Sequence, residues 1–176
     1  MNAQQPATST RQLAESKYKA ARGNLLLMLV FTLLNIVLLF TGSDVMLLFS
    51  ATIPYYAVIF GMLSENAVFL LFTVVVAAIA LIFYLLCWIF SKKRYGWMVA
   101  ALVLFLMDTL AMVGMFLLAE EPSGFLDLVF HAWVLYYLFI GVTNGRKLKE
   151  MPEEVVDAEV VNPQEDSVPF DGQTLN

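Results

Sequence analysis

The chain has 176 residues, of which 60% are hydrophobic and 14% charged, and its formal net charge is −5. A soluble domain is nearer half apolar and a quarter charged, so this composition excludes an ordinary soluble fold. No basic stripe suggests a nucleic-acid partner, and one histidine with one cysteine, Cys87, cannot assemble a structural zinc site or an internal disulfide. We therefore expect no metal, no cofactor and no bound nucleic acid.

Residues 1–23 are polar and precede the first apolar run. Within them, residues 10–22 predict a surface helix on the cytoplasmic side that leads into the membrane. A cleaved signal peptide is disfavoured, because no small-residue cleavage site follows the first apolar run.

Four apolar stretches between residues 24 and 143 are long enough, or nearly so, to cross a bilayer, which takes roughly 20 residues. A segment in lipid must satisfy its own backbone hydrogen bonds, so each stretch is expected to be helical. The sequence therefore predicts an all-α membrane protein, a four-helix transmembrane bundle. Its spans are residues 24–41, 67–90, 97–119 and 125–142.

A fifth apolar stretch, residues 45–63, contains Pro54 near its middle. Lys and Arg mark the cytoplasmic side of a membrane protein. The ten basic residues fall within 11–22, 92–94 and 146–149, and four spans place all three groups on one side. We therefore predict that 45–63 does not span but forms an outer-side interfacial or re-entrant element, two short helices hinged between Ile53 and Pro54. Both termini are then cytoplasmic, in a multi-pass protein of the cell inner membrane.

The C-terminal part, residues 144–176, is expected to form an acidic, disordered cytoplasmic tail. From Glu150 onward it holds eight acidic residues and no Lys or Arg. Such a segment has too little apolar surface to offset the entropy of ordering.

Three polar residues lie at nearly the same predicted depth. Asp108, His131 and Asn35 are each 11 residues from the cytoplasmic end of their span, which is roughly 16 Å along a helix. Asp127 precedes His131 by four residues, so both lie on one face of the fourth span, with Asp127 one turn nearer the outside. We predict a polar seam that pairs Asp108 with His131 and includes Asn35, with Asp127 leading outward.

This seam has two interpretations. Polar side chains between membrane helices hold helices together, but an ionisable group inside a membrane also marks sites that bind ligands or handle protons. Asp108, His131, Asp127 and Asn35 are accordingly the candidate residues for binding or proton handling.

No catalytic residue can be assigned from a motif. The sequence has no G-x-S-x-G elbow and no Gly-rich phosphate loop, and the predicted spans carry no serine to serve as a nucleophile near His131.

Several stretches resemble small, uncharacterised four-span integral membrane proteins of bacteria: RGNLLLMLVFTLLNIVLLFTGSD, FLMDTL, and DLVFHAWVLYYLFIGV followed by KLKEMPEE. The resemblance covers about residues 20–154. It implies a helical bundle in the inner membrane and transfers no functional residue.

The function expected first is that of a non-enzymatic accessory or scaffolding subunit, partnered by the lipid bilayer and by protein, either a homo-oligomer or another chain. The first alternative is a small oligomeric proton-linked transporter or channel subunit that uses Asp108 and His131. The second is an intramembrane enzyme whose site opens outward near Asp127 and His131.

Overall fold

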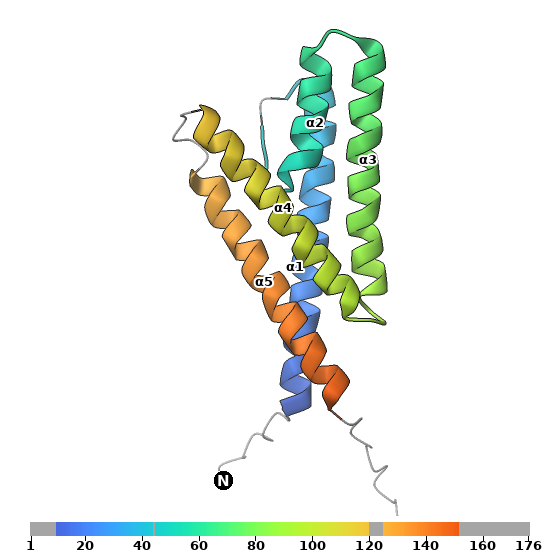
Figure 1. Ribbon diagram of the computed structural model, residues 1–176, viewed down its shortest axis with the longest axis vertical. Helices are drawn as coiled ribbons and strands as arrows, with labels where there is room; N and C mark the ends of the chain where they lie inside the picture. Colours follow the sequence, from blue (N-terminus) through green and yellow to red (C-terminus); the bar gives the residue numbers. More distant parts are fainter. Residues whose placement is uncertain (1–9, 44, 120–124, 152–176) are drawn as a thin grey trace, which may run out of the picture.

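The computed structural model describes residues 10–43, 45–119 and 125–151 and shows five helices (Figure 1). Residues 120–124, and the part of the predicted tail from residue 152 onward, lie outside the described residues. No strand occurs in the part of the chain that the structure describes. The helices are α1 (Thr10–Phe40), α2 (Thr52–Leu63), α3 (Ala67–Phe90), α4 (Gly96–Ala119) and α5 (Phe125–Glu150).

Helices α1, α3, α4 and α5 are each long and apolar enough to cross a membrane. Their most apolar 18-residue windows have mean hydropathies between 1.8 and 2.9, yet at most 28% of the residues in any window are buried inside the protein. Apolar surface on this scale needs lipid around it. The chain is therefore a multi-pass membrane protein, and the predicted four-helix bundle is confirmed.

Residues 10–22 are helical, as the sequence indicated, but they are continuous with the first span rather than a surface helix that leads into it. Together they form α1, which runs without a break over 31 residues. Gly23 does not break it, and the Asn24 side chain donates to the Ala20 carbonyl at 3.0 Å. At 1.5 Å per residue α1 is about 46 Å long, well above the roughly 30 Å of hydrocarbon. It therefore extends well beyond the apolar layer at the end of the bundle that carries the basic groups, called here the basic end.

Helix α5 lies against α1 and supports this extension. It continues to Glu150, so residues 144–150, which were predicted to belong to the disordered tail, are helical. Two glycines allow the close approach. A Cβ at Gly141 would lie 2.8 Å from the Cβ of Ala21, and one at Gly145 would lie 2.7 Å from the ring of Tyr18. The paired ends of α1 and α5 form a stem below the α3–α4 turn (Figure 1).

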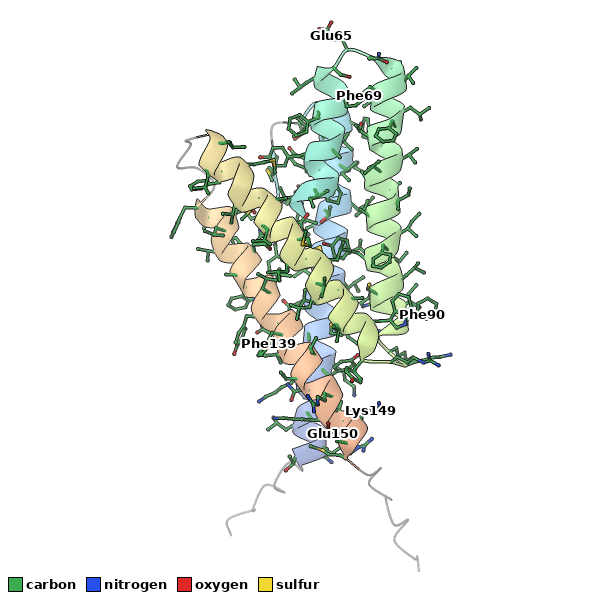
Figure 2. The ribbon with its side chains drawn as sticks, in the orientation of Figure 1. Glu65, Phe69, Phe90, Phe139, Lys149 and Glu150 are labelled. Carbon is green, nitrogen blue, oxygen red and sulfur yellow. The ribbon has the colours of Figure 1, made fainter. Side chains whose placement is uncertain are left out.

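The segment between α1 and α3 re-enters the bundle. After α1 the chain turns back alongside the helices, and α2 then starts in the middle of the molecule and returns to the same end (Figure 1). Figure 2 shows Glu65 in the turn between α2 and α3, far from Lys149 and Glu150 at the basic end. Asn66 caps α3 there, accepting from the backbone N–H of Val68 at 3.0 Å.

The prediction of two hinged helices within 45–63 is wrong, because only Thr52–Leu63 is helical. Pro54 lies in the first turn of α2, where its missing N–H costs nothing. Before that turn, Phe49 adopts φ +77°, which is strained for an aromatic residue. Its buried ring packs edge-on against Phe31 and Phe130, with ring centroids 6.3 and 6.0 Å away, and these contacts help to hold the unusual backbone.

Candidate functional site: a polar layer around the re-entrant segment

Asp108 on α4 and His131 on α5 face each other across the interface of these two helices. Oδ2 of Asp108 lies 3.3 Å from Nε2 of His131. Each residue is only 1% exposed. The structure therefore brings together the two residues that the sequence placed at equal depth.

The main partner of Asp108 is the start of α2, which the sequence did not indicate. Its Oδ2 accepts from the backbone N–H of Thr52 at 2.8 Å, and its Oδ1 accepts from that of Ile53 at 2.7 Å. The first N–H groups of a helix have no partner within the helix, and here the preceding residue, Ala51, provides no side-chain cap. Asp108 supplies that cap from another helix, with both carboxyl oxygens acting as acceptors at the N-terminus of α2.

His131 is oriented from both sides of its ring. Nδ1 lies 3.0 Å from the backbone carbonyl of Asp127, which can only accept, so Nδ1 carries a proton. Nε2 lies 3.1 Å from Oγ1 of Thr52, as well as facing Asp108. A hydrogen bond between Nε2 and the Asp108 carboxyl needs one proton, held by either group. The ring also stacks on Phe105, with centroids 5.0 Å apart.

Asp127 lies at the edge of this group. Its Oδ1 is 3.8 Å from Nδ1 of His131, and its side chain is 16% exposed. The same oxygen is buried and has no hydrogen-bond partner in the described part of the chain. Asp127 thus lies one helical turn from His131, as the sequence predicted.

Asn35 does not join the Asp108–His131 pair directly. Its side chain instead pairs with the backbone of Leu47 in both directions, accepting from the N–H and donating to the carbonyl, each at 2.7 Å. It also donates to Oγ of Ser50 at 2.9 Å. One turn away on α1, Oγ1 of Thr32 accepts from the N–H of Ala51 at 2.8 Å.

These contacts share one target. Asn35 and Thr32 from α1, and Asp108 from α4, bind backbone groups of the re-entrant segment between Leu47 and Ile53. Non-helical backbone is tolerated at membrane depth only where protein satisfies it. We call Thr32, Asn35, Thr52, Asp108 and His131 the polar layer.

Sequence reasoning missed Thr52 and Ser50, and also the role of the layer. A signal was present: Ser and Thr shortly before Pro54, inside an otherwise apolar run, are typical of a helix start. It identifies the start of α2 but not the distant carboxylate that caps it.

Every member of the polar layer is at most 2% exposed. Two cavities lie elsewhere, one of about 750 Å³ beside the α3–α4 turn and one of about 530 Å³ between α1, α5 and Phe49. Neither is lined by Asp108 or His131. Across residues 10–43, 45–119 and 125–151, no group of three His, Cys, Asp or Glu side chains could hold a metal ion.

Comparison with known proteins assigns no family to this chain. No protein-family model, no curated protein and no solved structure matches it.

Proposed function

We propose that the protein is a non-enzymatic accessory or scaffolding subunit of the bacterial inner membrane, and that its polar layer serves to hold the re-entrant segment in place. The observation that carries this proposal is that both side-chain oxygens of Asp108 are already engaged in hydrogen bonds. Both of its carboxylate oxygens accept backbone N–H groups, from Thr52 and from Ile53.

A carboxylate in this position is a poor candidate for chemistry. A group that binds a substrate or passes a proton must exchange partners and be reached from outside, whereas Asp108 and His131 are each 1% exposed. Moving Asp108 would leave the N–H groups of Thr52 and Ile53 without an acceptor, and a donor left without a partner away from water costs about 1–3 kcal/mol. The arrangement thus favours a rigid structural role.

The same proposal assigns the basic end to the cytoplasm, with both termini on that side. Residues 11–22, 92–94 and 146–149 carry all ten Lys and Arg residues of the chain. Cytoplasmic loops are enriched in Lys and Arg. The re-entrant segment then opens toward the outer face, and the projecting stem of α1 and α5 is available to cytoplasmic partners.

A second candidate, a proton-linked transporter or channel subunit, is favoured by one observation. Asp127 and Tyr84 each keep a buried oxygen without a hydrogen-bond partner among the described residues. Asp127 is also close to His131, which in turn contacts Asp108, so the three side chains are arranged in a series along which a proton could pass from Asp127 inward. The cavities of about 750 and 530 Å³ are lined by neither Asp127 nor His131, so they do not support an intramembrane enzyme at these residues.

Asp127→Asn separates the two candidates, since the Asp127 side chain holds no backbone N–H of the re-entrant segment. Purified protein would be reconstituted in vesicles containing a pH-sensitive dye, and proton flux measured under an imposed pH gradient. The scaffolding proposal expects wild type and D127N to leak no faster than empty vesicles. Flux in the wild type that D127N abolishes, with the melting temperature unchanged, would establish the transporter instead.

The scaffold itself is tested in native membranes. The wild-type chain, solubilised in mild detergent, is expected to migrate in an assembly larger than the purified chain alone forms. Asp108→Ala should release it from that assembly, whereas Thr109→Val, at the next position on α4, should not. Migration of the wild type at the size of the purified chain would contradict the proposal.

A further inference from the structure

The cavity beside the α3–α4 turn is lined by cationic side chains from three separate parts of the chain. They come from the start of α1 (Arg11), from the turn itself (residues 92–94, called here the basic turn) and from the end of α5 (Lys149). The cavity has a volume of about 750 Å³. Residues about 55 to 140 positions apart in the sequence thus enclose one positively charged hollow.

The three side chains of the basic turn are available for an anion. Lys92, Lys93 and Arg94 are exposed, and no acidic residue in the described part of the chain pairs with them. Lys149 lies over the ring of Tyr95, 5.9 Å from its centroid, which positions its ammonium beside the same hollow.

Arg22 has a different task. Its guanidinium donates to Oγ of Ser91 at 3.0 Å and to the Trp88 carbonyl at 3.1 Å. The Tyr18 hydroxyl donates to the Ser91 carbonyl at 2.6 Å. These three hydrogen bonds connect the end of α3 to α1, and they fix the position of the basic turn beside the stem.

The α4 helix adds to the positive potential. It begins at Gly96, which also lines the cavity, and the N-terminus of a helix carries a partial positive charge. The lining residues of the cavity include no Asp or Glu. An anion in the cavity is therefore attracted by positive charges on several sides, and no carboxylate among the lining residues repels it.

The position of the cavity relative to the membrane surface indicates which class of anion it would bind. The basic turn joins two spans, and the stem of α1 and α5 projects past it, so the corner between them lies at the membrane surface (Figure 1). Trp88 and Trp97 flank the turn, as aromatic residues do at the headgroup level. A lipid of that leaflet, packed against α3 and α4, would bring its phosphate into the corner.

We propose that this cavity binds the phosphate headgroup of an anionic phospholipid through Lys92, Lys93, Arg94 and Lys149. Basic hollows between spans at the membrane surface are suited to such headgroups. The site makes the protein selective for the lipids around its basic end. It does not depend on the scaffolding role proposed above.

Native mass spectrometry of the full chain in a nonionic detergent tests the site, with dioleoyl phosphatidylglycerol and dioleoyl phosphatidylcholine titrated separately. The wild type should bind phosphatidylglycerol at least about tenfold more tightly. Replacing all three residues of the basic turn by glutamine should weaken phosphatidylglycerol binding by about tenfold or more and leave phosphatidylcholine binding unchanged.

The matched control removes three positive charges that do not line the cavity, by combining Lys17→Gln, Lys19→Gln and Lys147→Gln. It should change phosphatidylglycerol binding by less than about twofold, since charges away from the site act only through screened, long-range attraction. Equal weakening in both triple variants, or in neither, would overturn the proposal, as would equal affinity of the wild type for the two lipids.

A further arm replaces the lipid with inorganic phosphate. If phosphate alone raises the melting temperature of the wild type as much as phosphatidylglycerol does, the cavity takes a small anion and the lipid assignment is overturned. Should the triple variant of the basic turn fail to fold, the single variants Lys93→Gln and Arg94→Gln take its place. Each should lower the affinity for phosphatidylglycerol by about fivefold or less, and no loss in either would count against the site.

Discussion

Replacing Asp108 tests the central claim about the polar layer, that one side chain on α4 caps the helix of the re-entrant segment. Asp108→Ala deprives the N–H groups of Thr52 and Ile53 of their only acceptor among the described residues. Thr52 is buried and Ile53 is partly exposed, and both begin α2 beside Asp108 in the middle of the bundle, at a depth where no bulk water replaces the lost bonds.

The magnitude follows from the number of bonds. A buried donor left without a partner costs about 1–3 kcal/mol, so two donors cost about 2–6 kcal/mol. The cost of placing Asp108 in the membrane does not offset this, because it is also present when the helices are inserted but separated. The expected loss exceeds the roughly 0.6 kcal/mol that a polar contact between membrane helices contributes on average.

Two measurements check the claim. Unfolding of the purified protein in mixed micelles, by titration with sodium dodecyl sulfate, gives the change in the free energy of unfolding. Hydrogen–deuterium exchange followed by mass spectrometry reports on a peptide covering residues 47–60. Asp108→Ala should lower the free energy by the amount above and raise exchange mainly in this peptide.

Thr109→Val is the control. Thr109 is the next residue on α4 and is also buried, but its hydroxyl bonds only to the Phe105 carbonyl of its own helix, at 2.8 Å. Its replacement should cost under about 1 kcal/mol. If Asp108→Ala is no more destabilising than Thr109→Val, or if exchange in residues 47–60 is unchanged, the capping argument is wrong.

Three further predictions concern the rest of the bundle. Gly141→Val should destabilise the protein by about 1–3 kcal/mol, because its side chain would collide with α1 and α4; Gly23→Ala, in open space on α1, should be neutral or stabilising by up to about 1 kcal/mol in the same titration. Asn35→Leu should raise hydrogen exchange at Leu47, whose N–H and carbonyl both lose their partner, and unchanged exchange there would contradict the pairing. Cys87, which is fully buried, should react with a water-soluble maleimide only after unfolding, and rapid labelling of the folded protein would show that α3 packs differently.

Much of the architecture followed from local sequence. A run of some 20 apolar residues must form a helix in lipid, because only a helix satisfies its own backbone groups there. The four spans were therefore predictable, and the grouping of basic residues excluded a fifth span over 45–63. The depth of Asp108 and His131 followed from the helical rise alone, and the structure places them 3.3 Å apart.

Other features depend on contacts between distant segments, and local sequence does not contain them. α1 stays continuous past Gly23 because α5 packs along it, and the re-entrant segment is extended before Thr52 because Asn35 and Thr32 bind its backbone. Asp108 could be recognised as a buried carboxylate that needs a partner. Its partners are two backbone N–H groups some 55 residues away, and only the tertiary structure decided this. The physical reason is that any N–H donor without a partner, brought to the same depth, could have bonded to this carboxyl group equally well.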